Sequence, residues 1–435
     1  MFLPPRPKNM RHASHVAARG AIHYRRTPCQ SVITQPRPKA VISLSSLVGS
    51  GTLASGMQIG ETGAVAVQWM CAVMWPRRLI DLFKIEVPIV QAPMAGAMDW
   101  ELVAAVSSAG GLGSLPCAML SPDQIREQVK KIRDQTPKPI NLNFFCHRPA
   151  VPSDAREAAW RERLAPYYRE MEIDPAAPIP IRDLRPFNAG PCAVVEDLKP
   201  EVVSFHFGLP EPALLERVKA AGCLVASSAT TTAEAKWLEK QGADAVIAQG
   251  LEAGGHRGMF LTEGVATQVG ALALVPQIAD AVNVPVIAAG GIADARGIAA
   301  AFALGAAGVQ IGTAYLFCPE SKISALHRSA LAAAQDDGTA LTNLMSGRPA
   351  RAVMNRLMRE IGPLSTLPPE FPLSAGALAP LRAKAEEQGS GDFSAMWAGQ
   401  AASLSRALPA AELTRKLAVG TLEVLHNLSM DGVRG

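Results

Sequence analysis

The chain has 435 residues, of which 49% are hydrophobic, 18% charged and 5% aromatic, which excludes global disorder and leaves too few rings for a platform that stacks nucleic-acid bases. The formal net charge is +4, but residues 1–60 contain eight Lys or Arg and no Asp or Glu. Removing those eight from the 42 basic residues leaves 34 against 38 acidic residues, a net charge of −4, so we expect no basic face for nucleic acid.

Residues 1–73 differ in composition from the rest of the chain. They are rich in Pro, Arg, Ser and Gly and have no sustained helical or strand periodicity. The uncharged stretch 40–60 contains too many Ser and Gly residues for a membrane span, so we expect no membrane partner. An Arg-rich, acid-poor start is typical of a transit peptide, but an upstream extension without a fold of its own is the favoured interpretation. We therefore expect the well-patterned part to begin near Met74.

From residue 85 onward, short Val- and Ile-rich strands alternate with amphipathic helices. We predict eight strands, over 87–94, 112–115, 140–145, 202–207, 224–227, 245–248, 285–289 and 308–311. The predicted helices cover 100–109, 122–135 (with Ser121 as N-cap), 155–171, 212–221, 232–241, 272–282 and 294–304. Several helices end at a glycine that leads directly into the next strand, which is typical of the αβ junctions of a parallel sheet.

Eight such units predict a closed (β/α)8 barrel, or TIM barrel, over residues 74–320, and a doubly wound sheet is the alternative fold. Residues 146–200 form a longer polar insertion in this barrel, with one predicted helix. Residues 321–435 are predicted to form a mainly helical cap, interrupted by a Pro- and Gly-rich stretch at 362–376. This cap is long enough to cover the barrel mouth.

The seven cysteines are scattered along the chain, and no Cys-x-x-Cys pair occurs among them. The pattern indicates neither a zinc site nor a disulfide framework. It is typical of a protein in a reducing compartment, so we expect a cytoplasmic location.

Two glycine sites follow predicted strands 7 and 8, where barrel enzymes often bind a phosphate. Gly290 and Gly291 end strand 7, and the run Gln310–Thr313 ends strand 8. Glycines there let backbone N–H groups approach phosphate oxygens, and the helix that follows adds its positive end. The alternative is that these are turn glycines, needed only for positive φ. Two such sites on adjacent strands favour a phosphate-bearing ligand.

His206 lies near the end of strand 4, in the sequence Ser-Phe-His-Phe-Gly. Strand alternation predicts Ser204 and His206 on one face, and Phe205 and Phe207 on the other. Because the helix-facing side of a barrel strand is apolar, we expect His206 to point into the mouth, where an imidazole can abstract a proton or stabilise an anion. Asn143, at the corresponding end of strand 3, is a candidate to hydrogen-bond a heterocycle.

The loop after strand 6, from Gln249 to Gly258, is dense in glycine and could wrap a ring or a ribityl chain. It contains His256, for which an incidental place in a flexible loop is favoured over a catalytic role. No carboxylate accompanies His256 at Glu-x-x-His spacing, and we predict no metal site.

Six motifs at the strand ends resemble those of the nitronate monooxygenases, formerly called 2-nitropropane dioxygenases. They are Gln91-Ala-Pro-Met94, Asn141-Leu-Asn143, Ser204-Phe-His-Phe-Gly208, Gln249-Gly-x-Glu-Ala-Gly-Gly-His256, Ala289-Gly-Gly-Ile292 and Gln310-Ile-Gly-Thr313. The resemblance runs from about residue 74 to 425, including Ser346-Gly-Arg-Pro-Ala-Arg351 in the tail. It implies an FMN-containing TIM barrel with His206 as the active-site histidine. The implied cofactor-binding residues are Ala92, Pro93 and Met94 along the isoalloxazine, and Asn143, Gln249, Gly254, Gly290, Gly291, Gln310, Ile311, Gly312 and Thr313.

The reaction implied by this resemblance is oxidation of a small anionic alkyl nitronate by O2 to a carbonyl compound and nitrite. In members that use neutral nitroalkanes the histidine is a base, and where only the nitronate is accepted it orients the anion; both roles are open for His206. FMN-dependent enoyl-thioester reductases, which use NAD(P)H, share the Glu-Ala-Gly-Gly-His loop. They resemble each other in a Gly-Ala-Gly-Asn-Pro turn at strand 4, where this chain has Ser-Phe-His-Phe-Gly. Further alternatives are a non-catalytic flavin- or phosphate-binding module and a non-flavin barrel such as a phosphosugar isomerase.

Overall fold

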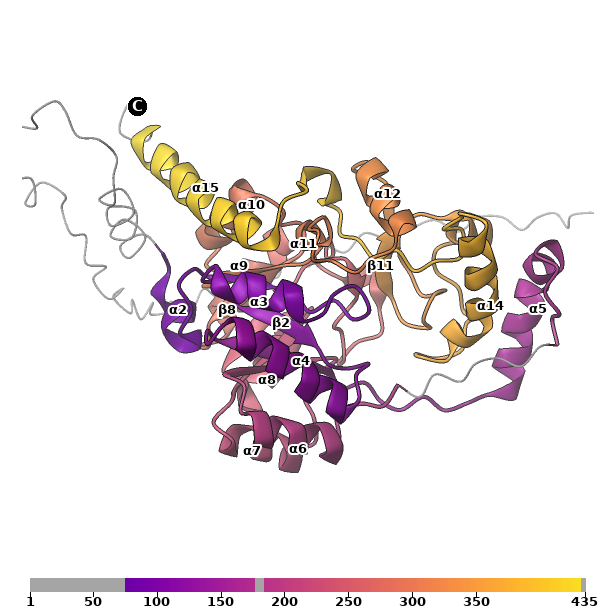
Figure 1. Ribbon diagram of the computed structural model, residues 1–435, viewed down its shortest axis with the longest axis horizontal. Coiled ribbons are helices and arrows are strands. Elements are labelled where there is room, and N and C mark those ends of the chain that lie inside the picture. The colour runs from indigo at the N-terminus through magenta and orange to yellow at the C-terminus, as the bar shows by residue number, and fades with distance from the viewer. Residues whose placement is uncertain (1–74, 177–183, 432–435) are drawn as a thin grey trace, which may run out of the picture. The chain divides into compact units, whose positions relative to one another are not determined.

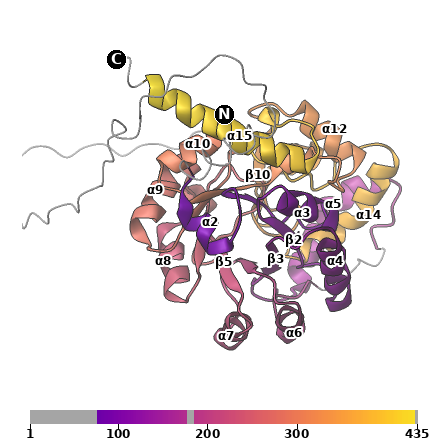
Figure 2. The same cartoon turned by 60° about the vertical axis from the view of Figure 1, so that its left-hand side comes forward.

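The structure, a computed structural model, describes residues 75–176 and 184–431 and contains a barrel of eight parallel strands (Figures 1 and 2). The strand order is β1-β9-β8-β6-β5-β4-β3-β2. A parallel bridge between Val90 and Leu112, the residue before β2, joins the two edges. The strands are β1 (Ile89–Gln91), β2 (Gly113–Pro116), β3 (Ile140–Phe145), β4 (Val202–His206), β5 (Leu224–Ala229), β6 (Ala245–Gln249), β8 (Val286–Ala289) and β9 (Gly308–Ile311). The predicted (β/α)8 barrel is confirmed.

Helices surround this barrel on the outside, as Figure 2 shows. They are α3 (Trp100–Ser108), α4 (Pro122–Gln135), α6 (Ala189–Leu198), α7 (Pro212–Ala220), α8 (Thr232–Lys240), α9 (Ala271–Ala281) and α10 (Ala295–Ala303). Helix α2 (Arg77–Phe83) precedes β1, and α15 (Ala410–Asp431) packs against α3 and α10. Val, Ile, Leu and Ala side chains of the strands and the inner helix faces form one continuous core.

Local sequence signals explain where several of these helices begin and end. Ser121 caps α4 as predicted: its hydroxyl accepts from the Gln124 N–H, and the Gln124 side chain accepts in return from the Ser121 N–H. Gly242 and Gly305 follow α8 and α10 with φ of 95° and 94°, the left-handed conformation that turns the chain from a helix into the next strand.

The polar insertion and the tail fold together as a second layer over the barrel mouth. The insertion was predicted to hold one helix and holds two: α5 (Asp154–Glu170) joins this layer, whereas α6 packs with the barrel helices α4 and α7. The tail contributes α12 (Ala325–Ala333), α13 (Arg356–Ile361) and α14 (Ser374–Glu387). Helices α5 and α14 lie side by side in Figure 1. Their aromatic and aliphatic side chains form a separate hydrophobic cluster, which includes Trp160 and Tyr167 of α5 and Leu381 of α14. The inner surface of this layer faces the ends of the barrel strands.

A small antiparallel sheet, which the sequence did not reveal, ties the tail to the barrel. Strand β11 (Ala350–Val353) lies between β10 (Thr339–Thr342) and β7 (Gly255–His256). Its pairing of Ala350 with His256 clamps the glycine-dense loop after β6. These strands have two to four residues and partners far away in the sequence, so no local periodicity indicates them.

The expectations on residues 1–73, including a transit peptide, lie outside the residues that the structure describes. Within 75–176 and 184–431, no helix has the length and apolar character needed to cross a membrane.

Candidate functional site

A cavity of about 1050 Å³ opens at the carboxyl ends of the strands, beneath the insertion and the tail. This volume is at the upper end of the range of cofactor and ligand pockets. It is also where barrel enzymes place their chemistry. Of the residues predicted to contact a cofactor, the cavity is lined by Ala92, Pro93, Met94, Asn143, Gln249, Gly254, Gly290, Gly291, Gln310, Gly312 and Thr313.

Ile311 is the one predicted cofactor contact whose side chain does not line this cavity. Its side chain is 1% exposed and belongs to the barrel core. Alternation along β9 explains the difference, because Gln310 faces the cavity and its neighbour faces the helices. Ile311 can therefore meet a ligand only through its backbone, whose carbonyl already accepts from the Ala92 N–H.

Below the cavity, polar side chains form a hydrogen-bonded ladder inside the barrel. The Asn141 amide donates to the hydroxyls of Ser114 and Ser204, at 3.0 and 2.8 Å. The Asn143 amide donates to the Ser204 hydroxyl at 2.9 Å. This ladder orients the Asn143 side chain at the cavity floor and leaves its carbonyl oxygen outside the ladder.

His206 lies at the end of β4 and lines the cavity, as predicted from strand alternation. Its Nε2–H donates to the His256 carbonyl at 3.1 Å, and its Nδ1 accepts from the Ser228 hydroxyl at 3.0 Å. A carbonyl can only accept, so this arrangement selects the neutral Nε2–H tautomer. Burial, together with the positive charges of Arg348 and Arg257, lowers the pKa of His206 to about 4. The imidazole is therefore neutral at physiological pH.

Phe207 departs from the predicted alternation. Its φ is 72°, a left-handed conformation that is rare for a bulky residue, and the strand ends there. The turn directs its ring toward the cavity side, against His206 and Phe371, instead of toward the helices. Phe205 does take the helix-facing side in the core, so the prediction was correct for Phe205 and wrong for Phe207.

His256 is more than an incidental loop residue. It lines the cavity beside His206, and its Nε2 is hydrogen-bonded to the Ser346 hydroxyl of the tail at 2.8 Å. Its ring also packs against Phe371 and Trp397. Burial, with His206 and Arg348 nearby, lowers its pKa to about 3. The site thus holds two adjacent neutral imidazoles, one oriented by the barrel and one by the tail.

Gln249 holds the loop after β6 in place. Its amide donates to the His256 carbonyl at 2.9 Å and accepts from the Gly258 N–H at 2.7 Å. A Cβ on Gly258 would lie 2.9 Å from the His206 ring, so a glycine is required for the loop to pass this close. Ser228 was missed in the sequence, although it could have been noticed as a hydroxyl at the end of a barrel strand. Ser346 was named only as part of a motif in the tail, and its contact with His256 was not predicted.

The predicted phosphate sites lie side by side at the ends of β8 and β9. Gly290 and Gly291 have φ of 105° and 72°, and a Cβ on Gly290 would lie 2.9 Å from the Ala253 nitrogen. Thr313 begins the short helix α11 (Thr313–Leu316), whose first turn has no side-chain cap. The start of helix α10 is less available for binding a phosphate than expected, because the Asp294 carboxylate already accepts hydrogen bonds from the N–H groups there.

Gly254 marks a close approach between the loop after β6 and the tail. A Cβ there would lie 2.5 Å from the Gly399 nitrogen and 2.6 Å from the Ala398 carbonyl carbon. The Gly399 N–H in turn donates to the Thr313 hydroxyl at 2.9 Å. The tail thereby contacts the predicted phosphate region at this point.

We expect Gly254→Ala to lower the free energy of unfolding by about 1–3 kcal/mol, because the methyl group must push two backbones apart. The free energy measured by denaturant unfolding should show this loss. Gly190→Ala is the matched control, because its Cβ would make only an ordinary contact with Asn188 Oδ1 at 3.4 Å. Wild-type stability of Gly254→Ala would show that the contact does not constrain the site.

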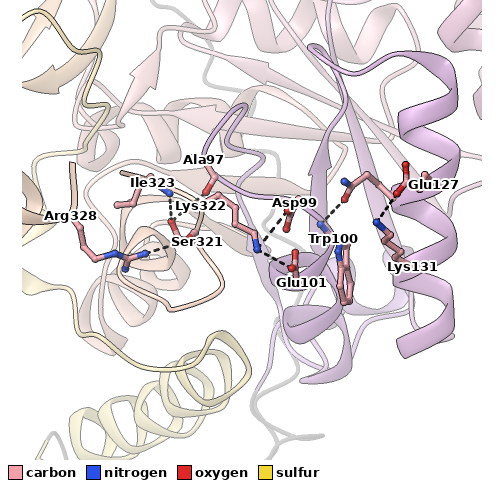
Figure 3. A network of polar contacts seen from close by, with 11 residues as sticks. Ala97, Asp99, Trp100, Glu101, Glu127, Lys131, Ser321, Lys322, Ile323 and Arg328 are labelled. Atoms are coloured by element: carbon pink, nitrogen blue, oxygen red, sulfur yellow. Dashed lines mark hydrogen bonds and ion pairs between the residues drawn. The ribbon is translucent and has the colours of Figure 1, made fainter. Parts of the chain in front are cut away.

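Figure 3 shows a polar network around Lys322, which lines the cavity. The Lys322 ammonium lies 2.9 Å from Glu101 Oε1 and 3.8 Å from Asp99 Oδ2. Burial and the neighbouring Glu101 carboxylate raise the pKa of Asp99 to about 6. The Lys322 backbone N–H also donates to the Ala97 carbonyl at 2.8 Å. This network fastens the loop after β1, which lines the cavity, to the start of the tail.

The electrostatic surroundings of the cavity are positive. Its charged lining residues within the described part of the chain are all basic: Arg185, Lys322 and Arg382. Behind this lining lie the guanidinium groups of Arg257, Arg348 and Arg351. Arg257 and Arg351 are buried and donate to backbone carbonyls, Gln268 and Thr339. A positive, water-restricted site of this kind favours an anionic ligand.

Among residues 75–176 and 184–431, no group of three or more His, Cys, Asp or Glu side chains is placed so that it could hold a metal ion. The five cysteines described in this part of the chain are free.

The chain is similar to known proteins both in sequence and in structure. The family model "Nitronate monooxygenase" matches residues 77–420. A Pseudomonas aeruginosa protein named nitronate monooxygenase is 44% identical over 344 residues, which are 78% of this chain and 97% of that protein. The solved structure of a nitroalkane oxidase from Streptomyces ansochromogenes is 38% identical with a TM-score of 0.73, over 81% of this chain and 99% of that one. FabK from Thermotoga maritima is 29% identical with a TM-score of 0.60, over 81% and 98%.

Proposed function

Because the chain belongs to the nitronate monooxygenase family of oxidoreductases, we propose that it oxidises a small anionic alkyl nitronate with O2 to a carbonyl compound and nitrite, and that its cofactor is FMN. The observation that carries this proposal is a barrel-mouth cavity whose described charged lining is basic and whose His206 is neutral. A nitronate is already deprotonated at carbon, so it requires attraction and orientation, and it does not require a base.

The residues around the cavity fit FMN. Gln310 lines the cavity, and its buried Oε1 has no hydrogen-bond partner in the described structure, so it is available to accept from a ring N–H. Asn143 adds a carbonyl oxygen at the cavity floor. Gly290, Gly291 and the uncapped start of α11 offer backbone N–H groups of the kind that bind phosphate. We propose that the amides hold the ring and the glycines hold the phosphate.

In this proposal FMN supplies the redox-active ring that accepts electrons from the substrate. His206, neutral and held by Ser228 and the His256 carbonyl, offers an oriented Nε2–H that a nitronate oxygen can share with that carbonyl. The basic surroundings stabilise the anion, and the tail excludes bulk water. The protein residues themselves therefore contribute binding, orientation and electrostatic stabilisation.

An enoyl-thioester reductase is the second candidate, since FabK-like enoyl reductases share the fold. The similarity is weaker, 29% identity against 38% for the nitroalkane oxidase. The end of β4 also differs from the glycine-rich turn of the reductases, because it presents His206 to the cavity. These observations support the monooxygenase.

The cytoplasm is the compartment that we propose for this reaction. The free state of all five described cysteines supports it, since several are buried and none is paired.

The test is nitrite release from a short alkyl nitronate in air, without NAD(P)H, by protein purified with its yellow chromophore. We expect rapid nitrite formation and FMN as the extracted flavin. A yellow protein that makes no nitrite but oxidises NAD(P)H with an enoyl thioester would overturn the proposal in favour of the reductase. A colourless protein that cannot be reconstituted with FMN would contradict the cofactor.

Gln310→Leu separates the cofactor role of this residue from a structural one. Removing an unsatisfied buried acceptor should leave the flavin-free protein as stable as the wild type or more so, whereas FMN affinity should fall by roughly tenfold or less. Melting temperatures with and without FMN, and quenching of flavin fluorescence, measure the two effects. Gln268→Leu should behave oppositely and destabilise both forms, because Gln268 Oε1 accepts two hydrogen bonds from Arg257. Equal FMN affinity in Gln310→Leu and the wild type would exclude the proposed contact.

A further inference from the structure

Arg348 is a cation placed one layer of side chains behind the cavity wall. Its guanidinium carbon lies 4.1 Å from the centroid of the Phe207 ring, and that ring lies 4.4 Å from the ring of His206. Arg348 itself does not line the cavity, whereas His206 does. The charge therefore lies close behind the position where the substrate is proposed to bind, without contact to it.

The positive charge of Arg348 is poorly compensated. Its side chain donates a hydrogen bond to the Met259 carbonyl, and its buried Nε has no partner among the described residues. Glu234 and Glu263 act on it only from beyond ion-pair distance. The Glu234 carboxylate already accepts hydrogen bonds from the Thr230 hydroxyl and from backbone N–H groups. A partly buried cation without a carboxylate in ion-pair contact is unfavourable for folding, so another anion is expected to benefit from it.

We propose that Arg348 is a specificity-determining residue that makes this site favour the anionic nitronate over the neutral nitroalkane, through the fixed charge that it holds behind the His206–Phe207 wall. The inference rests on the function proposed above. Arg185 and Arg382 also line the cavity, but Arg348 is the cation that stacks on Phe207 next to His206. Lys322 is paired with Glu101 and Asp99, and His206 and His256 are neutral.

The surroundings of the two histidines support this assignment. The positive charges of Arg348 and Arg257 act on His206, and Arg348, His206 and His147 act on His256. Arg348 therefore helps to keep both imidazoles neutral, and it remains the countercharge for an anion. Stacking of the guanidinium on Phe207 also holds the left-handed turn that follows His206.

The experiment compares Arg348→Gln, which keeps an N–H donor for the Met259 carbonyl, with Arg348→Lys, which keeps the charge. kcat/KM is measured for an alkyl nitronate. For the neutral nitroalkane, kcat/KM is measured or, where it is not turned over, its competitive inhibition constant. A full charge about 10 Å from an anion, at an effective dielectric constant of about 20, changes the equilibrium by roughly tenfold. Arg356→Gln is the matched control, because Arg356 is also a tail arginine that lies over an aromatic ring, 5.4 Å from the centroid of Tyr167 in α5.

We expect Arg348→Gln to lower kcat/KM for the nitronate by about tenfold, with little change for the nitroalkane, and Arg348→Lys to restore the preference. NMR titration of the His206 and His256 rings should show higher pKa values in Arg348→Gln only, a change that loss of packing alone does not produce. Equal losses for both substrates, or a lysine variant that behaves like the glutamine variant, would overturn the inference. Where Arg348→Gln does not fold, Arg348→Met gives the same comparison. Absence of nitrite from the wild type would instead contradict the proposed function, so the two failures are distinguishable.

Discussion

Replacement of His206 by asparagine is expected to slow nitrite release from an alkyl nitronate by about two to three orders of magnitude. The imidazole lines the cavity as a neutral donor, held between the Ser228 hydroxyl and the His256 carbonyl. The shorter amide of asparagine cannot keep both contacts and also orient an anion. Flavin content should be unchanged, because no proposed FMN contact includes His206. Steady-state nitrite assays with protein of known flavin content measure the effect.

The same variant decides between the two roles of the histidine. With its pKa lowered to about 4, His206 is a weak base at neutral pH, so we expect nitronate oxidation to be lost along with any nitroalkane oxidation. His426→Asn, a change at an exposed histidine of α15, should leave the rate unchanged. A His206→Asn enzyme that loses only nitroalkane oxidation would identify the histidine as a base and refute the orienting role.

Acidification from pH 7.5 to 5 is expected to lower the free energy of unfolding by about 3 kcal/mol. The pKa values of His206 and His256 are lowered to about 4 and 3, from 6.5 in the unfolded chain. Below pH 6.5 the unfolded chain therefore binds protons that the folded protein does not, and stability falls as the pH falls toward 4. Each histidine contributes a loss of about 2 kcal/mol at pH 5. Asp99, whose pKa is raised to about 6, binds a proton more readily in the folded protein and so offsets about 1 kcal/mol of this loss.

Denaturant unfolding at the two pH values measures this loss. His256→Gln should reduce the difference by about 2 kcal/mol, because one imidazole whose pKa is strongly lowered is removed. His426→Asn should leave the difference at its wild-type value. Stability that is constant or rises between pH 7.5 and 5 would show that the two imidazoles are not held neutral in the folded protein.

The barrel could be predicted from the sequence because its signals are local. Strand periodicity, the Ser121 capping box and glycines such as Gly242 and Gly305 each act within a few residues, and all point to the same βα units. Alternation along β4 was likewise sufficient to direct His206 toward the mouth. The fold and the position of His206 could therefore be predicted from residues that are close together along the chain.

The electrostatic character of the site depends on contacts between residues far apart in the sequence. Ser228 is 22 residues from the histidine that it orients, and Ser346 is 90 residues from His256. The left-handed turn that moves Phe207 from the helices to the cavity is stabilised by Arg348, which comes from the tail. Local patterns cannot encode such contacts, because packing of the tail onto the barrel creates them. The sequence by itself determined which groups stand at the ends of the strands, and only the tertiary structure decided their protonation, their partners and the charge behind them.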